Sequence, residues 1–418
     1  MKSNSALPAV ILAILSGLGP RAFSQGNLTP PGPPAPEMKS LQEIWDKIGA
    51  LETQNQALQD QVTGLQTQNQ GLANLLLSIG QNTGALPWQI TTVDSVGAFG
   101  GESSLAFTPG GQPAISYYEG SNVDLKYAVF DGSIWTLTTV DSIGFVGASN
   151  SLAFTPGGQP AISYFDDTND DLKYAEFDGS TWTITTVDST GNVGLYTSLA
   201  FTPSGQPAIS YYDDTNDDLK YAVFDGSAWT LTTVDSAGIV GISTSLAFTP
   251  SGEPAISYYD LTNDDLKYAV HYGFLWTVTT VDSTGNVGGE SSLAFTPGGQ
   301  PAISYYDNTN SHLKYAVFNG STWTLTTVDS IGYVGGSTSL AFTPGSQPAI
   351  SYYDFTNADL KYAVYNGSIW TVTTVDSQGA VGLLTSLAFT PGGQPAITYR
   401  DATNRNLKYA VRVPFAAP

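Results

Sequence analysis

The sequence predicts an all-β domain, a seven-bladed β-propeller of four-stranded blades, preceded by an α-helical coiled-coil stalk. Three observations support this prediction: a tryptophan that recurs every 47 residues, four strand-like segments in each repeat, and a heptad pattern of leucines upstream. The chain of 418 residues accordingly divides into five segments. They are a signal peptide (1–24), a proline-rich linker (25–38), a coiled-coil helix (39–80), a second linker (81–87) and the propeller (88–418).

Seven tandem repeats make up the propeller segment. Their tryptophans are Trp88, Trp135, Trp182, Trp229, Trp276, Trp323 and Trp370. Each unit contains the segments WTLTTVD, SLAFTP, PAISYYD and LKYAVFDG or close variants, which are rich in β-branched and aromatic residues and are separated by turn sequences. Four short strands at a fixed period of this length are typical of a propeller blade, so seven units predict seven blades.

Loop lengths predict the order of strands within a blade. A short turn joins LKYAVF to WTLTTV, whereas about ten residues separate WTLTTV from SLAF, so the long connection crosses between blades. SLAF is then innermost, followed by PAISYY, LKYAVF and the outermost WTLTTV. The last repeat lacks an outer strand, so we expect residues 88–93 to pair with residues 407–411 and close the ring.

The N-terminal segment has the features of an export signal. Lys2 precedes an apolar run at Ala6–Gly19, and the small residues Ala22 and Ser24 suit a cleavage site. The run is too short to span a bilayer. We therefore expect a secreted protein, extracellular or periplasmic, with no membrane span after cleavage.

The heptad pattern predicts a homo-oligomer through a parallel coiled coil. With Leu41 at position a, Leu51 and Leu58 fall at d, and polar Asn55 and Asn69 fall at a. Both a dimer and a trimer fit this pattern. The alternative is an amphipathic helix that packs on the downstream domain.

Composition excludes several classes of partner and chemistry. There are 14 Lys and Arg against 36 Asp and Glu, and a net charge of −22 repels nucleic acid and anionic membranes. Because the chain has no Cys, disulfides, thiolate metal sites and cysteine nucleophiles are excluded. The lysines of the repeated LKY motif occupy one position in every blade, which favours structural ion pairs with nearby Asp residues.

One face of the propeller is expected to carry a ligand site. The inter-blade loops and the loops between second and third strands emerge there together, because strand direction alternates. Carboxylate, amide and aromatic groups on this face suit sugar hydroxyls and C–H surfaces, although Asp and Asn are also strong turn formers. The candidate ligand residues are Asp166, Asn169, Tyr212, Asp213, Asn216, Tyr259, Asp260, Asn263, Tyr306, Asp307, Asn310, Tyr353, Asp354 and Asn357.

Differences between the repeats concentrate in the same loops. Examples are Phe99–Glu102, Leu195-Tyr196, Gly289-Glu290 and Leu383-Leu384. Binding of a ligand and free drift of loop sequence both account for this variation.

No cofactor is expected, and calcium is left open as an alternative. Clustered carboxylates in the DDTNDDL loops suit a hard cation, but these loops lack the glycine of a calcium loop, and the later blades lose an Asp. The weak calcium candidates are Asp170, Asp171, Asp217, Asp218, Asp264 and Asp265.

The DGSxW segment, for example Asp131-Gly132-Ser133-Ile134-Trp135, resembles the Asp-box of sialidase-type propeller repeats, with one residue fewer between Asp and Trp. This resemblance covers the seven-repeat domain and implies a structural turn. Sialidases use three arginines from different blades, whereas Arg400, Arg405 and Arg412 all lie in the last repeat, so sialidase activity is not implied. The architecture is also loosely similar to that of propeller lectins, by analogy of fold.

Sequence motifs indicate binding more than catalysis. His271 and His312 occupy non-equivalent positions, and no HExxH or GxSxG motif is present, so no catalytic residue is predicted. The predicted function is a secreted, oligomeric, multivalent binding module for extracellular glycans. The alternatives are a polysaccharide-acting hydrolase or lyase, and a structural surface or matrix protein that binds protein partners.

Overall fold

The computed structural model describes residues 46–51, 53–62, 87–96 and 101–413, in two compact units formed by residues 1–66 and 67–418. In the first unit, residues 46–51 and 53–62 are helical, and Leu51, Leu58 and Val62 on this helix are exposed. The expected signal peptide, both linkers up to residue 86 and the rest of the expected stalk lie outside the described residues. Coiled-coil pairing is therefore not shown. No described helix has the length and apolar character needed to cross a membrane.

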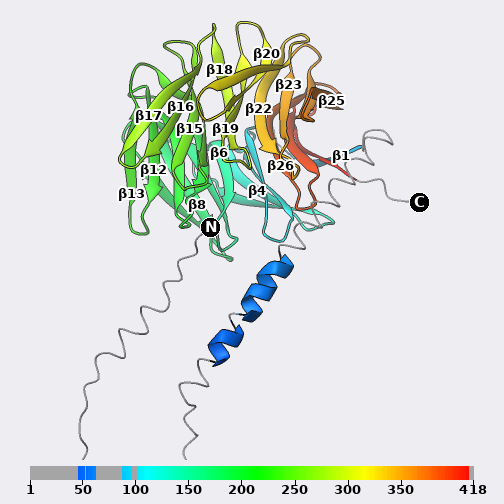
Figure 1. The fold of residues 1–418 in the computed structure, drawn as a ribbon. Helices are drawn as coiled ribbons and strands as arrows, with labels where there is room; N and C mark the ends of the chain where they lie inside the picture. Colours follow the sequence, from blue (N-terminus) through cyan, green and yellow to red (C-terminus); the bar gives the residue numbers. More distant parts are fainter. Residues whose placement is uncertain (1–45, 52, 63–86, 97–100, 414–418) are drawn as a thin grey trace, which may run out of the picture. The chain divides into compact units, whose positions relative to one another are not determined.

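The second unit consists of strands (Figure 1). Blade 1 contains β2 (Ser103–Phe107), β3 (Pro113–Glu119), β4 (Asp124–Phe130) and β5 (Trp135–Asp141). Blade 2 contains β6 (Val146–Phe154), β7 (Pro160–Asp166), β8 (Asp171–Phe177) and β9 (Trp182–Asp188). Blade 3 contains β10 (Val193–Phe201), β11 (Pro207–Asp213), β12 (Asp218–Phe224) and β13 (Trp229–Asp235). Blade 4 contains β14 (Val240–Phe248), β15 (Pro254–Asp260), β16 (Asp265–Tyr272) and β17 (Leu275–Asp282).

The remaining three blades follow the same pattern. Blade 5 contains β18 (Val287–Phe295), β19 (Pro301–Asp307), β20 (His312–Phe318) and β21 (Trp323–Asp329). Blade 6 contains β22 (Val334–Phe342), β23 (Pro348–Asp354), β24 (Asp359–Tyr365) and β25 (Trp370–Asp376). Blade 7 contains β26 (Val381–Phe389), β27 (Pro395–Asp401), β28 (Asn406–Arg412) and β1 (Trp88–Asp94).

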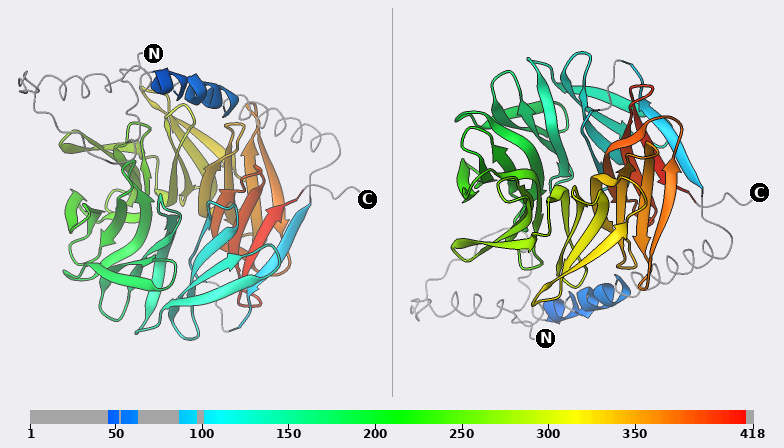
Figure 2. Two further views of the ribbon diagram at one scale, coloured as in Figure 1. Left: turned by 90° about the horizontal axis from the view of Figure 1, so that it is seen from below. Right: turned by 90° about the horizontal axis from the view of Figure 1, so that it is seen from above.

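Seven antiparallel four-stranded sheets surround a common centre, which confirms the predicted propeller and its strand order (Figure 2). The inner strands of successive blades are joined by hydrogen bonds, such as the one from the Leu152 amide of β6 to Ser104 Oγ of β2, at 3.0 Å. Outer strands such as β5 and β9, in contrast, begin with a half-buried Trp, continue with four exposed residues and end with two buried ones.

The N-terminal strand closes the ring as predicted. β1 pairs antiparallel with β28, with Trp88 opposite Arg412 and Ile90 opposite Ala410. Core residues of blade 1, including Leu105 and Ile115, pack with Leu407 of blade 7. Both ends of the domain therefore complete one blade, and no outer sheet position of blade 7 is left empty.

Each interface between blades is a small hydrophobic core made from both partners. Between blades 2 and 3, Leu172 and Tyr174 pack with Val193 and Tyr211. Trp229 meets the edge of Tyr174 with ring centroids 5.4 Å apart. Repetition of these contacts is why the strands show little alternation of polar and apolar residues.

The inner strands begin earlier than the sequence suggests. Four residues separate Asp188 at the end of β9 from Val193 at the start of β10, where the sequence suggested a connection of about ten. The register of β10 shifts between Leu195 and Ser198, as in a β-bulge. Gly194 has a φ of +107°, and a Cβ there would lie 2.8 Å from the Leu172 Cα, so only glycine fits. Much of the expected loop is therefore bulged strand, packed on the preceding blade.

Candidate functional site

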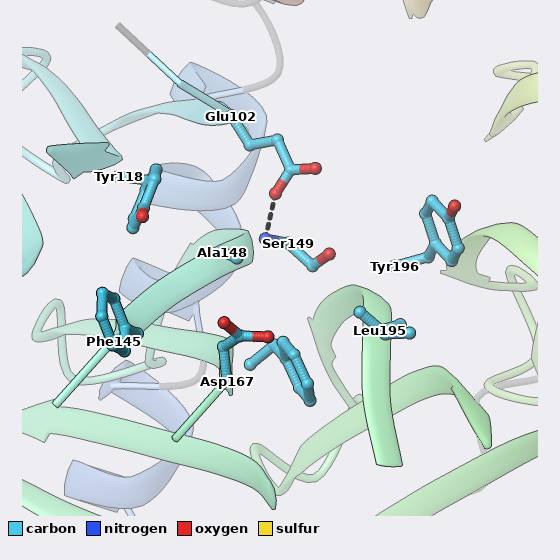
Figure 3. A pocket seen from close by; sticks show the side chains of 9 residues that line it. Glu102, Tyr118, Phe145, Ala148, Ser149, Asp167, Leu195 and Tyr196 are labelled. Atoms are coloured by element: carbon cyan, nitrogen blue, oxygen red, sulfur yellow. Dashed lines mark hydrogen bonds between the residues drawn. The ribbon is translucent and has the colours of Figure 1, made fainter. Parts of the chain in front are cut away.

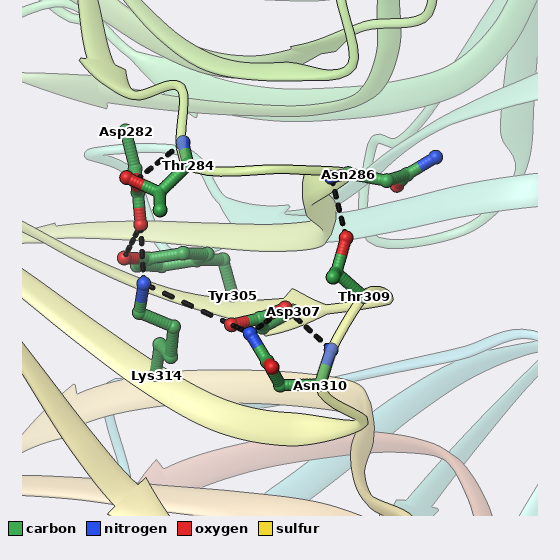
Figure 4. A network of polar contacts seen from close by, with 8 residues as sticks. All are labelled: Asp282, Thr284, Asn286, Tyr305, Asp307, Thr309, Asn310 and Lys314. Atoms are coloured by element: carbon green, nitrogen blue, oxygen red, sulfur yellow. Dashed lines mark hydrogen bonds and ion pairs between the residues drawn. The ribbon is translucent and has the colours of Figure 1, made fainter.

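A polar network between neighbouring blades contains two of the candidate ligand residues, Asp307 and Asn310 (Figure 4). Asp282 of blade 4 accepts hydrogen bonds from Tyr305 Oη of blade 5, at 2.8 Å, and from Lys314 Nζ. Lys314 Nζ also lies 3.9 Å from Asp307 Oδ2, which accepts a 3.0 Å hydrogen bond from Asn310 Nδ2. The repeated lysines thus form the predicted structural ion pairs in all seven blades.

The charges in this network hold each other in place. Burial by itself would raise the pKa of Asp282, but hydrogen bonds from Lys314 and Tyr305 outweigh it and lower the pKa below its ordinary value. Burial and the neighbouring charge of Asp282 raise the pKa of Tyr305. The carboxylate therefore stays ionised and the hydroxyl stays protonated, as the hydrogen bond between them requires.

The structure places one set of the candidate ligand residues in each of blades 2–6 and does not bring them together in a single cavity. Their aspartates are buried and accept hydrogen bonds from the Asn three residues later; the pairs are Asp166–Asn169, Asp213–Asn216, Asp260–Asn263, Asp307–Asn310 and Asp354–Asn357. The candidate tyrosines Tyr212, Tyr259 and Tyr353 are buried, and Tyr306 is half-buried. These contacts give the aspartates and asparagines a turn-stabilising role, and their role in ligand binding stays a prediction.

The calcium candidates lie in turns. Asp170, Asp217 and Asp264 adopt left-handed conformations with φ near 60°, and the other three begin the third strands. Asp217 accepts a hydrogen bond of 2.7 Å from Tyr212 Oη. Within the described residues, no group of three or more His, Cys, Asp or Glu side chains is placed to hold a metal ion. Calcium binding stays an untested alternative.

A cavity of about 280 Å³ opens among blades 1, 2 and 3 on the face where the inter-blade loops emerge (Figure 3). Its lining combines aromatic rings with carboxylates and a hydroxyl, and it contains no Lys or Arg. The lining residues are Glu102, Tyr118, Phe145, Ala148, Ser149, Phe165, Asp167, Leu195 and Tyr196.

Backbone geometry fixes the positions of these side chains. Glu102 immediately precedes β2, and its Oε2 accepts a hydrogen bond from the Ser149 amide of the next blade. The Phe145 amide donates to Thr168 Oγ1 at 2.7 Å, and the Phe145 carbonyl accepts from the Asp167 amide at 2.9 Å. The loop that carries Phe145 is therefore tied to the loop that carries Asp167, and both face the same cavity.

The cavity is lined by carboxyl and hydroxyl groups and by no cationic side chain. Burial raises the pKa of Glu102, and the hydrogen bonds with Ser149 oppose this shift. Burial and the charges of Asp167, Glu119 and Glu102 raise the pKa of Tyr118. Such a cavity offers hydrogen-bond acceptors and protonated hydroxyls, and it disfavours anionic ligands.

Tyr196 brings a third blade into the site. It lies on the β10 bulge with a φ of 53° and is 41% exposed, so its ring is open to a ligand. Burial raises its pKa, and so do Glu102 of blade 1, Asp214 of blade 3 and Glu290 of blade 5. Carboxyl groups from blades 1, 3 and 5 therefore influence the Tyr196 hydroxyl electrostatically.

None of the cavity residues belongs to the set of candidate ligand residues from the sequence. Comparison of the repeats with one another did mark Glu102, Tyr196 and Glu290 as departures from the common pattern. That signal marked Glu102, Leu195 and Tyr196 of the cavity lining, but it also marked residues outside the cavity, such as Gly289 and Leu383. Phe145 and Asp167 could be assigned to the cavity only from the structure, because the pairing of their loops places them in the same lining as Glu102.

The fold and cavity define a β-propeller with an aromatic and acidic pocket near its inner strands. No protein-family model matches the sequence, and no curated protein matches it. Among solved structures, the chain is similar to YCF48 bound to a peptide, with a TM-score of 0.53, 12% identity and coverage of 78% of this chain and 96% of that chain.

It is also similar to an ulvan lyase, a polysaccharide lyase, with a TM-score of 0.53, 12% identity and coverage of 76% and 95%. The Aleuria aurantia lectin, in complex with Fucalpha1-6GlcNAc, gives a TM-score of 0.47, 14% identity and coverage of 69% and 98%. At these identities, the similarity to YCF48 and to the lyase shows the propeller fold alone.

Proposed function

We propose that this protein is a secreted, oligomeric binding module that recognises extracellular glycans through the cavity of blades 1–3. The observation that carries the proposal is the lining of that cavity, where the aromatic residues Tyr118, Phe145 and Tyr196 surround the carboxylates of Glu102 and Asp167. Aromatic faces pack on the C–H surfaces of sugars, and carboxylates accept hydrogen bonds from their hydroxyls.

The charge of the cavity narrows the class of glycan. Two carboxylates and no cation line it, and the chain as a whole carries a net charge of −22. A sulfated or uronic-acid polymer would be repelled. Neutral saccharides, or saccharides with free amino groups, are therefore the proposed ligands.

Multivalency is the proposed role of the N-terminal helix. Leu51, Leu58 and Val62 fall at heptad positions d, d and a, and they are 63%, 59% and 53% exposed in the single chain. Burial of this stripe against copies of the same helix would link two or three propellers. Linked propellers are retained on a glycan-bearing surface far better than one propeller is, because binding of one propeller raises the effective concentration of the others at the surface. Export through residues 1–24 belongs to the same proposal.

A glycan array tests the proposal. The full-length protein is compared with the Phe145→Ala variant and with a Leu51→Glu/Leu58→Glu variant that disrupts the helical stripe. We expect retention on neutral glycans, reduced by both changes, and little retention on sulfated or uronic-acid glycans. Negligible retention of the full-length protein on every glycan would contradict the proposal.

A second candidate function is cleavage of a neutral polysaccharide. The raised pKa of Glu102 favours this alternative, because a shift in that direction favours the acid form of the carboxyl group, which can donate a proton to a leaving oxygen. Incubation with neutral polysaccharides, followed by assays for new reducing ends and for unsaturated products, separates the two functions. Products formed by the wild type and not by Glu102→Gln would identify an enzyme.

Binding of a protein partner is the remaining alternative from the sequence. The similar structure of YCF48, whose ligand is a peptide, gives one reason to test it. Retention of the full-length protein on a deglycosylated protein surface, without retention on glycans, would favour this role.

A further inference from the structure

We propose that the propeller contains a second saccharide site, centred on Glu290 at blades 5 and 6, so that one ring is bivalent. This inference rests on the proposed function and extends it to a site with different lining. It comes from comparing the cavity residues with the residues four repeats later in the same chain.

Glutamate is rare at the position that Glu102 occupies. The equivalent residues of the other blades are Ser149, Tyr196, Ser243, Glu290, Ser337 and Leu384, so only blade 5 repeats the carboxylate. Glu290 Oε2 accepts a hydrogen bond from the Ser337 amide of blade 6, just as Glu102 accepts one from Ser149. Burial raises the pKa of Glu290, and the Ser337 hydrogen bond opposes the shift, as at Glu102.

The aromatic residues around Glu290 repeat as well. Tyr306 stands where Tyr118 stands in the first cavity, and Tyr333 stands in place of Phe145. The Tyr333 amide donates to Thr356 Oγ1 at 2.8 Å, and the Tyr333 carbonyl accepts from the Phe355 amide at 2.9 Å. These two hydrogen bonds match those of Phe145, so Tyr333 is held in the same way at the rim.

One substitution makes the second site more apolar. Phe355 replaces Asp167, and its ring lies 4.9 Å from the Tyr353 centroid and 5.9 Å from the Tyr306 centroid. The ring also lies against Gly336, where an added Cβ would be 2.3 Å from Phe355 Cε2. Phe355 is nevertheless 45% exposed and Tyr333 is 62% exposed, so both rings remain available for stacking.

The two sites therefore differ in chemistry. The first offers two carboxylates, whereas the second offers one carboxylate, with Phe355 in contact with Tyr306 and Tyr353 at the place of the second carboxylate. We expect the second site to prefer a saccharide face rich in C–H groups and to bind hydroxyl-rich faces less tightly. Both lie on the face of the inter-blade loops, so one branched or extended glycan surface can engage both.

Native mass spectrometry of the full-length protein with chitohexaose, laminarihexaose and cellohexaose counts bound saccharides per chain. We expect two per chain for the wild type, one for Phe145→Ala and one for Tyr333→Ala, and none for the double variant. Ile239→Ala, the equivalent change in blade 4, is the matched control and should leave two. Thermal melting of each variant verifies that it is folded.

A second test gives the second site the chemistry of the first. Phe355→Asp restores the acceptor of the first cavity and should tighten the weaker binding step roughly tenfold for a hydroxyl-rich saccharide. If the wild type binds one saccharide per chain, and this binding is lost in Phe145→Ala but unaffected by Tyr333→Ala, the second site is contradicted and the proposed function stands. No binding of any of the three saccharides would overturn both.

Discussion

Six non-glycine residues adopt a left-handed backbone conformation at one position of the inner strands. They are Ser149, Tyr196, Ser243, Glu290, Ser337 and Leu384, with φ between 51° and 55°. This conformation costs an L-residue about 1 kcal/mol, and glycine adopts it freely. Under the proposed function, the side chains of Tyr196 and Glu290 contact the ligand from this position.

Replacement of Tyr196 by glycine should separate binding from stability. Relief of the left-handed strain offsets the added freedom of the unfolded chain, so we expect the free energy of unfolding to change by less than about 1 kcal/mol. Retention on neutral glycans should fall about fivefold or more, which corresponds to losing one stacking contact. Ser243→Gly is the control and should change neither quantity. Equal retention of Tyr196→Gly and the wild type would show that the ring does not contact the glycan.

The buried tyrosines should contribute to stability through their hydroxyls. Tyr305→Phe removes the 2.8 Å donor to Asp282 and should lower the free energy of unfolding by about 1.5–3 kcal/mol in chemical denaturation. Tyr333→Phe, in an exposed loop, serves as the control and should have no effect on stability. A loss below about 0.5 kcal/mol at Tyr305 would mean that Lys314 and the Thr284 amide hold the Asp282 carboxylate without help from Tyr305.

At the scale of elements, β1 determines whether the ring is closed. Trp88 lies 5.5 Å from Tyr362 of blade 6 in an edge-to-face arrangement, and Arg412 of β28 lies 5.7 Å from the Trp88 ring. The strand thus joins the first residues of the domain to its last two blades. Loss of this contact exposes the edge of blade 7.

Trp88→Ala should lower the free energy of unfolding by about 2–4 kcal/mol, since it removes a large half-buried side chain. Ile90→Ala on the same strand is the control, because Ile90 is exposed, and it should cost less than about 1 kcal/mol. Equal effects of the two changes in chemical denaturation would contradict closure by packing of Trp88.

Much of the fold could be predicted from the sequence, because local signals and the repeat agree. Strand order and the pairing of residues 88–93 with residues 407–411 followed from loop lengths and the period. The bulged start of the inner strands could not be predicted, since Gly194 resembles a turn residue and its need for glycine arises from contact with Leu172 of the preceding blade.

The candidate site was less predictable than the fold. Asp166 and its equivalents looked available to a ligand, but they are buried and held by Lys173, Asn169 and the equivalents of these two residues. The cavity depends on three blades, and Asp167 and Phe145 meet through loop pairing that no local pattern specifies. Departures from the repeat, such as Glu102, were the useful signal.

At the scale of the whole molecule, the repeated networks set the pH range of stability. The pKa values of Asp166, Asp260 and Asp282 are lower than the ordinary 3.8, because hydrogen bonds with the lysines and other donors outweigh burial. Their stabilising contribution is present above the ordinary pKa and is lost as pH falls below it. Burial and neighbouring carboxylates raise the pKa of Tyr211 and Tyr305 above 10.0, so their contribution is lost as pH rises beyond that value.

The melting temperature should therefore fall below about pH 4 and above about pH 10, while Glu102 and Glu290, whose pKa values burial raises, should make it decline slightly as pH rises above their ordinary 4.5. Scanning calorimetry across this range measures the effect. A steep loss of melting temperature between about pH 7 and pH 5 would contradict this account, since it would require groups whose pKa values lie in that interval.

Hydrogen-exchange mass spectrometry of the full-length protein, with and without chitohexaose, laminarihexaose or cellohexaose, tests the central claim most directly. If the cavity binds neutral saccharide, backbone amides around residues 145–149 and 195–197 will exchange more slowly when saccharide is bound. Amides of the hairpin turns on the opposite face, such as residues 131–134, will be unchanged. Protection confined to those hairpin turns, or no protection with any of the three saccharides, would contradict the claim.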